Sequence, residues 1–334
     1  MFFRKIFVAL LTLILFNFNN FSFAEENEFK TSYLVSTPQE EGSGGSEVFS
    51  NKNKNMEKIY APILFFDSKE KAPLTSVENY VKTGLSLVAY KNGKKYKIIK
   101  RKLKLEDMEK YPSKFIFINN EKVELALQSN NKVSPYERVV YTRKIIIENY
   151  THIQYWFFYS FNDTTDVGGG SLISKCGNHQ ADWEHISLKI NTEKFNQAKT
   201  ELEYLNAIEE TFFAQHNKGQ HDDRKRKKIS DNLVKFEGTH IKAFPARGTH
   251  ATFYESGIYS IADLLFFKLK DIADGNGEIL YSENFLVDME KQSWSKYGGR
   301  WGQISDDYCN IAEKTTKASN DGEVGPIQQL KGID

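Results

Sequence analysis

The clearest pattern in the chain is a series of short segments dense in Val, Ile, Tyr, Phe and Trp. Their length and composition are typical of β-strands, and they cover residues 139–147, 152–161, 183–190, 239–244 and 250–254. The first two are joined by a connection of hairpin length. Because the chain combines many short strands with few helical patterns, we predict a mainly β fold, an antiparallel β-sandwich with helical insertions.

One helical pattern interrupts these strands. Its apolar residues recur at three- and four-residue spacing, the period of one helix face: Phe195, Ala198, Leu202, Leu205, Ile208 and Phe212. We expect Asn191 or Thr192 to cap its start, because their side chains accept hydrogen bonds from the free amides of a first helical turn. A shorter helix is expected over residues 76–80, with Ser76 as its cap.

Residues 1–24 have the pattern of a secretory signal peptide. Arg4 and Lys5 precede an apolar run over residues 6–16, and residues 22–24 supply the small side chains that signal peptidase recognises. The pattern predicts export through a Sec-type pathway to the periplasm or the extracellular space. A retained N-terminal anchor is the alternative.

The remaining chain divides into a leader and one domain. Residues 25–57 are rich in Glu, Asn, Lys, Ser and Gly and predict a flexible leader, followed by a single β-sandwich-like domain over residues 58–334. That domain has no apolar run long enough to cross a bilayer, which excludes a multispanning membrane protein. The chain has 45 Lys and Arg against 44 Asp and Glu, so it lacks the basic balance of a nucleic-acid-binding protein.

Cys176 and Cys309 are the only cysteines. In an oxidising compartment they are expected to form a disulfide, which would close a loop of about 130 residues and stabilise the fold by roughly 4–5 kcal/mol. The alternative is a pair of unpaired buried thiols.

The densest group of side chains with metal-binding or acid/base ability is found in residues 178–185, Asn-His-Gln-Ala-Asp-Trp-Glu-His. If Asp182 opens a strand, Asp182 and Glu184 project from one face, and Trp183 enters the core from the other. His179 lies just before them and can fold back. One imidazole and two carboxylates suit a divalent cation such as calcium, magnesium or zinc. The same three groups could perform acid/base chemistry without a metal.

Two further histidines are candidate catalytic acids or bases. His216 follows the helical pattern, and His250 lies in the turn Gly248-Thr249-His250-Ala251 between two predicted strands. For either histidine alone, the alternative is an ordinary imidazole whose hydrogen bonds are satisfied in the interior or at the surface.

A group of aromatic residues near the C-terminus offers a binding surface. Trp294, Tyr297 and Trp301 are interspersed with glycines and are candidate contacts for a glycan, a lipid head group or an envelope surface. The alternative is that they close the end of the sandwich.

Several of these motifs occur together in a known order. They are residues 60–66, 155–159, 179–185, 215–216, 248–251 and 301–302. In this order they resemble the vacuolar-protein-sorting-associated protein sixty-two-like family, whose members carry an Asp-Trp-Glu-His core and a Gly-Ser-His-Ala turn. Thr249 replaces the usual Ser here. The resemblance covers about residues 59–326 and implies an architecture more than an activity.

A looser similarity concerns the cation site. Necrosis-inducing cytolysins are secreted β-sandwich proteins whose Gly-His-Arg-His-Asp-Trp-Glu motif helps to hold a divalent cation. This chain keeps the Asp-Trp-Glu triplet, and His179 is in register with the first His of that motif. Ala181 replaces the second His. The similarity implies a cation near His179, Asp182 and Glu184, and does not imply toxicity.

Three hypotheses follow from these residues. The first is an exported, divalent-cation-binding β-sandwich protein that engages a glycan, a lipid head group or an envelope surface. The second is a metal-dependent hydrolase of an ester or phosphoester, with His216 or His250 as acid or base beside a metal-bound water. The third is a structural envelope protein whose polar cluster braces a turn. Convergence of the histidines with Asp182 within roughly 6 Å would favour the first two.

Overall fold

The computed structural model describes residues 55–130, 133–164, 177–215, 234–264, 267–304 and 323–326. Contacts divide the chain into residues 1–46 and 47–334, and every described residue belongs to the second unit. Outside the described residues lie the signal peptide, nearly all of the leader, Cys176, Cys309 and His216. The predictions on them therefore stay predictions. Within the described ranges, no helix has the length and apolar character that a membrane span requires.

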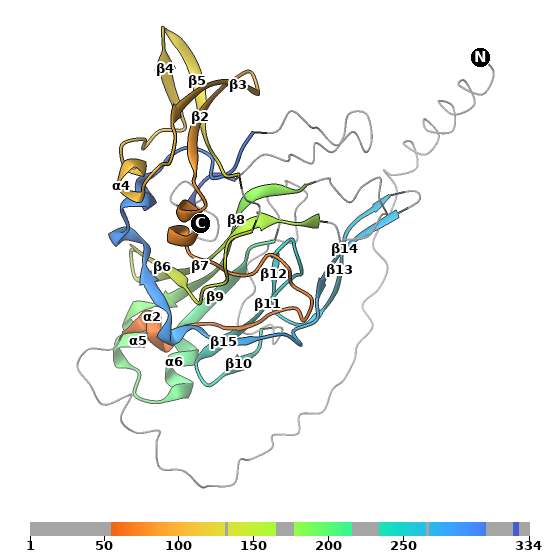
Figure 1. Ribbon diagram of the computed structural model, residues 1–334. Helices are drawn as coiled ribbons and strands as arrows, with labels where there is room; N and C mark the ends of the chain where they lie inside the picture. The colour runs from red at the N-terminus through yellow and green to blue at the C-terminus, as the bar shows by residue number, and fades with distance from the viewer. Residues whose placement is uncertain are drawn as a thin grey trace, which may run out of the picture. The chain divides into compact units, whose positions relative to one another are not determined.

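The centre of the fold is a five-stranded sheet in the order β16-β6-β7-β8-β9. Figure 1 labels its strands β6 to β9. Its strands are β6 (Val140–Ile147), β7 (Tyr150–Asn162), β8 (His179–Asn191), β9 (Ile208–Phe213) and β16 (Leu286–Asp288). Neighbours from β6 to β9 are antiparallel, whereas β16 runs parallel to β6. The strands predicted between residues 139 and 190 are confirmed, and β7 and β8 extend beyond their predicted ends.

A second sheet packs on one face of the central sheet. Its order is β10-β11-β1-β15, and β12 pairs with β11. The strands are β1 (Ile63–Phe65), β10 (Phe236–Glu237), β11 (His240–Pro245), β12 (Thr252–Phe253) and β15 (Ile279–Tyr281). Leu64 and Ile241 from this sheet share a buried cluster with Tyr155, Phe157 and Ile186 from the central sheet. Two sheets with a common apolar core form the predicted β-sandwich.

Two β-hairpins lie side by side in a four-stranded sheet, which we refer to as the meander, and this sheet contributes to the core on the other face of the central sheet. Its order is β3-β2-β5-β4, with β2 (Ser86–Lys91), β3 (Lys94–Lys100), β4 (Phe115–Ile118) and β5 (Glu121–Gln128). Leu87 and Leu125 belong to the same buried cluster as Trp156 and Phe158 of β7. Strand β7 is therefore buried on both faces, which explains why it is apolar almost without alternation. A further hairpin joins β13 (Gly257–Leu264) and β14 (Phe267–Ala273).

The helices are short. They are α2 (Met56–Ile59), α3 (Val77–Lys82), α4 (Leu105–Met108), α5 (Thr192–Gln197) and α6 (Glu201–Ala207), with 3₁₀ turns η5 (Ser282–Asn284), η6 (Met289–Lys291) and η7 (Ser293–Lys296). The predicted cap of α3 is confirmed, because Ser76 Oγ accepts a hydrogen bond from the Asn79 amide at 3.0 Å. Asn191 likewise caps α5.

The single helix predicted over residues 195–212 is wrong. Helix α5 ends at Gln197, α6 starts after Thr200, and Ile208 begins strand β9. Thr200 and Glu203 form a capping box, in which each side chain accepts a hydrogen bond from the other residue's backbone amide. This restarts the helix, and β9 gains hydrogen bonds along the edge of β8 that a continued helix would forgo.

Candidate metal centre

The polar cluster predicted from the sequence lies at the start of β8. Ala181 has a φ of +57°, a left-handed conformation that is uncommon for a residue with a side chain. Beyond it the side chains alternate as predicted. Asp182 and Glu184 lie on the face of the sandwich core. Trp183 lies on the opposite face, with its ring centroid 4.6 Å from that of Phe158.

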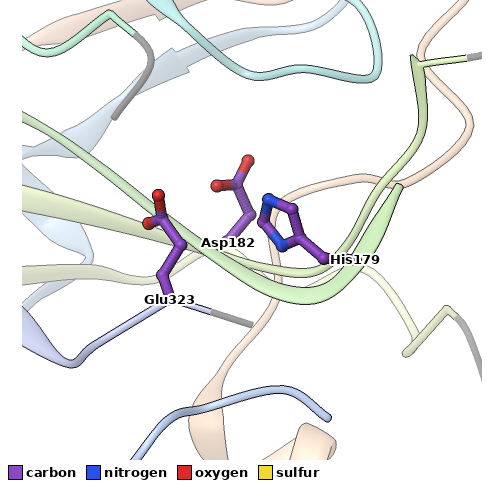
Figure 2. Close-up of side chains that lie close together, drawn as sticks. All are labelled: His179, Asp182 and Glu323. Carbon is purple, nitrogen blue, oxygen red and sulfur yellow. The ribbon is translucent and has the colours of Figure 1, made fainter. Parts of the chain in front are cut away.

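His179, Asp182 and Glu323 each place a possible ligand atom within 4.8 Å of the others (Figure 2). His179 and Asp182 are buried, and Glu323 is half-buried. Two backbone amides hold Glu323 in place. The Trp301 amide donates to its carbonyl oxygen at 2.8 Å, and the Trp183 amide donates to its Oε2 at 3.3 Å. The structure thus adds a residue that no sequence motif had marked.

Glu184, the third ligand expected from the sequence, is not one of these three residues. It is buried on the same face of β8 as Asp182. Its role as a ligand stays a prediction, and the geometry favours Glu323 in its place.

The hydrogen bonds of His179 define which nitrogen can bind a cation. Nδ1 lies 2.9 Å from the carbonyl oxygen of Ala181 and therefore donates to it. Nε2 is then the acceptor, 2.9 Å from Nδ2 of Asn162. The other amide atom, Asn162 Oδ1, is buried and has no hydrogen-bond partner among the described residues. A half-turn of this amide would exchange the Nδ2 donor beside Nε2 for an oxygen of the kind that ligates divalent cations.

His250 lies against Asp182 and is completely buried. Its Nδ1 is 2.8 Å from Asp182 Oδ2, and its Nε2 is 3.0 Å from the carbonyl oxygen of Ala72. Both partners only accept, so both nitrogens donate and the ring is an imidazolium. Burial lowers the pKa of His250, but the carboxylates of Glu70, 3.7 Å from Nε2, and Asp182 outweigh it and raise the pKa to about 9.

Glu70 and Tyr159 complete the surroundings of His250. Burial tends to raise the pKa of Glu70, but the charge of His250 and the amides of Gly248 and Ala72 lower it overall. The Tyr159 ring stacks on the imidazolium, with centroids 3.7 Å apart and an interplanar angle of 6°. Counting the carboxylate of Glu323 beside Asp182 as well, the cluster contains three carboxylates and one imidazolium and is formally negative.

The turn that carries His250 requires glycine. Gly248 has a φ of +72°, and a Cβ there would lie 2.1 Å from the carbonyl oxygen of Asp163. The Gly248 amide donates to Glu70 Oε2 at 2.6 Å. His250 itself has a φ of +57°. Strained residues on both sides of the Asp182–His250 contact are typical of functional sites.

One of the two predicted acid/base histidines, His250, lies in contact with Asp182. His216 lies outside the described residues. The catalytic role of either histidine stays a prediction.

The predicted contact aromatics need correction. Trp294, Tyr297 and Trp301 are each only 1% exposed. They pack edge-on against one another and around Trp183 in the cluster between the central sheet and the meander. Their spacing with glycines reflects close packing, because Gly299 and Gly325 lie against the rings of Tyr297 and Trp301. They are interior packing residues and not surface contacts, but they lie on the meander side of the central sheet and not at an end of the sandwich.

These features agree with one protein family. The family model for vacuolar protein sorting-associated protein 62 matches residues 48–304. The match covers most of the chain and includes the β8 cluster and the Gly248 turn. The chain therefore belongs to this family. No curated protein matches it.

Among solved structures, the chain is similar to necrosis and ethylene inducing protein 2 from the causal agent of cocoa's witches' broom disease. The identity is 12%, 73% of this chain and 77% of that chain are covered, and the TM-score is 0.35. NLPPya in complex with mannosamine is 10% identical over 74% of this chain and 78% of that one, with a TM-score of 0.33. The non-toxic HaNLP3 protein is 12% identical over 76% of each chain, with a TM-score of 0.32. These neighbours belong to the group whose Asp-Trp-Glu motif the chain resembles.

Proposed function

We propose that the protein binds one divalent cation between His179, Asp182 and Glu323. The observation that carries this proposal is the convergence of one imidazole and two carboxylates from β8 and from residues 323–326. Asn162 Oδ1 would be a fourth ligand, reached by rotation of its amide. The cation would satisfy this buried oxygen and balance the negative charge of the cluster.

The chemistry of the donors narrows the choice of ion. Calcium and magnesium prefer shells made of oxygen alone, whereas an imidazole nitrogen among carboxylates suits zinc and other borderline ions. His179 offers Nε2 with its Nδ1–H held by a carbonyl oxygen, the arrangement that usually orients a metal-binding histidine. Zinc is therefore the ion that we favour.

The hydrolase hypothesis has less support. It requires an acid or base beside the cation. Of the two candidates, His250 already uses both nitrogens in hydrogen bonds to Asp182 and Ala72, and His216 lies outside the described residues. Export through the predicted signal peptide and a Cys176–Cys309 disulfide remain part of the proposal. Mass spectrometry of the exported chain, with Glu25 as the expected first residue and both cysteines resistant to alkylation, tests both.

The cation is tested by thermal unfolding of chelator-treated protein titrated with zinc, manganese, magnesium or calcium. At a hundredfold excess over Kd, a ligand specific for the native state stabilises by about 2.7 kcal/mol. Each kcal/mol corresponds to roughly 2–4 °C in a large domain. Glu323→Gln should abolish the shift, whereas Glu255→Gln, a half-exposed carboxylate away from the site, should keep it.

Asn162 gives a second, sharper variant. Asn162→Asp supplies an oxygen whichever way the side chain turns, so it should bind the cation more tightly than the wild type. Asn162→Leu should bind it more weakly. The proposal is wrong if no cation raises the melting temperature of the wild type, or if Glu323→Gln responds as the wild type does.

A further inference from the structure

The region of strands β2 to β5 has an excess of positive charge, whereas the rest of the chain has an excess of negative charge. Residues 86–128 contain 11 Lys and Arg against 5 Asp and Glu, whereas the remaining residues contain 34 against 39. Residues 91–104 alone hold eight Lys and Arg and no acidic residue. Such a segregation of charge within a nearly neutral chain indicates an anionic partner.

The two hairpins of the meander place their turns at the same end of the sheet (Figure 1). Asn92 and Gly93 form one turn, and Asn119 and Asn120 form the other, all with positive φ, as tight two-residue hairpin turns require. A salt bridge of 2.7 Å between Lys91 Nζ and Glu121 Oε1 joins the two turns.

The acidic residues of the meander are already neutralised. Glu124 is paired with Lys114 at 3.0 Å and with Arg300 at 2.6 Å. Asp107 is paired with Lys100 and Lys110. The lysines that follow the first turn, Lys94 and Lys95, are exposed and form no ion pair with any described residue, and Lys95 Nζ donates to the neutral Gln128 Oε1 at 3.0 Å. Their charges therefore face solvent.

Both hairpins also carry exposed aromatic side chains, Tyr96 on β3 next to these lysines and Phe117 on β4 at the opposite edge of the sheet. Phe117 is 72% exposed, more than any other large apolar side chain in the described ranges, and Tyr96 is 40% exposed. Phe117 pairs across the hairpin with Lys122, whose ammonium group lies 4.3 Å from the ring centroid of Phe115. We name Lys94, Lys95, Tyr96, Phe117 and Lys122 the hairpin surface.

We propose that the hairpin surface docks on a membrane rich in anionic lipids, with the lysines on the phosphate groups and Phe117 inserted among the head groups. Basic residues and an exposed apolar side chain at the same end of the sheet match both layers of such an interface. A ring without a polar group, held at the end of a stiff hairpin, gains more from a lipid interface than from a flat, hydrated polyanion. This inference goes beyond the cation site and uses none of its residues.

The test is flotation of the full chain with phosphatidylcholine vesicles, with or without phosphatidylglycerol, in chelator so that the cation plays no part. Hydrogen exchange then locates the contact, and residues 94–97 and 115–122 should gain protection only with anionic vesicles. The apolar residues 6–16 are common to all variants, so differences between variants report the hairpin surface. Lys94→Glu with Lys95→Glu should weaken partitioning at least roughly fivefold per lysine, and added salt should reduce this difference.

Phe117→Ser should weaken partitioning roughly tenfold, with little dependence on salt. Its matched control is Ile146→Ser on β6, because Ile146 is 69% exposed on another part of the chain. The control for the lysines is Lys69→Glu with Lys82→Glu, two exposed positions outside the meander. Melting temperatures should match the wild type in all four variants, because every substituted side chain is exposed.

Three results would overturn the proposal. They are equal protection with neutral and anionic vesicles, variants that bind no worse than their controls, and binding to heparin or RNA without binding to vesicles. None of them bears on the cation site, whose own test uses no lipid.

Discussion

Both faces of strand β8 are buried at residues 182 and 183, but different interactions stabilise them. On one face, Trp183 packs among the aromatic rings of the meander side, and its indole Nε1 has no hydrogen-bond partner among the described residues. On the other, Asp182 is equally buried and makes a charged hydrogen bond to His250. The aromatic face is stabilised by close packing and buried apolar area. The polar face is stabilised by the pairing of opposite charges.

This difference shows how one short motif can both fix a strand in the core and position a charged side chain. Strand alternation sends neighbouring side chains to opposite faces. The bulky Trp183 fixes the position of the strand, which leaves Asp182 held rigidly on the polar side. Substitutions on the two faces should therefore fail for different reasons.

The largest effect is expected on the aromatic face. Trp183→Ala should lower the free energy of unfolding by about 3–5 kcal/mol, through lost apolar contacts and the cavity that remains. Urea unfolding measures the loss. Trp183→Phe should cost clearly less, since no described residue accepts a hydrogen bond from the indole N–H. Equal costs for the two variants would contradict packing as the dominant contribution of this face.

On the polar face, Asp182→Asn should cost about 2–3 kcal/mol, because it removes the charged acceptor of His250 Nδ1 while Glu70 still balances the ring. The matched comparison is His250→Gln alone and in combination with Asp182→Asn. The double variant should cost less than the sum of the single variants, because the two residues form one interaction. Additive costs would show that the two side chains act independently.

The smallest effect on stability is expected for Asp107, a carboxylate near the meander. Its ion pairs can be compared with the contact of Asp182. Hydrogen bonds from Lys100 and Lys110 lower the pKa of Asp107, but these lysines are 40% and 62% exposed, so salt screens the pairs. Because the folded pKa lies below the unfolded value of about 3.9, this stabilisation is present at neutral pH and lost as the pH falls below about 4.

Melting curves of the wild type and Asp107→Asn at pH 6 should differ slightly. The difference should shrink both in acid and in high salt. A difference that persisted unchanged in high salt would show that the Asp107 pairs are shielded from salt, as the contact of Asp182 with the buried His250 is.

Most of the central sheet was predictable from sequence, because β6, β7 and β8 carry dense β-branched and aromatic runs and β8 alternates in its Asp-Trp-Glu-His motif. The meander was missed, although Asn92-Gly93 is a strong hairpin signal. Lysines on the exposed face of β3 dilute its apolar pattern there. The division of the predicted helix could have been found in Thr200 and Glu203, which have the spacing of a capping box.

The candidate site was predictable only in part. His179 and Asp182 are close in sequence, so their proximity follows from local geometry. Glu323 accepts a hydrogen bond from the amide of Trp183, which is 140 residues away in the sequence. No recognisable motif marks the sequence around Glu323, so only the fold brings it to the site. The burial of Trp294 and Trp301 could not be predicted from the sequence either, because a tryptophan near a glycine is common both in binding loops and in tightly packed interiors.

The position of β1 has a consequence for the order of folding. Strands β6, β7, β8 and β9 pair with neighbours that are close in the chain, so their contacts form after the closure of comparatively short loops. Ile63 of β1 pairs with Lys242 and Tyr281, about 180 and 220 residues away, and these pairs must wait for much longer loops to close. We therefore expect the central sheet to form early and the strand between β11 and β15 to be inserted late. Until that insertion, the aromatic residues of β7 that face the second sheet are open to chaperones and to other chains.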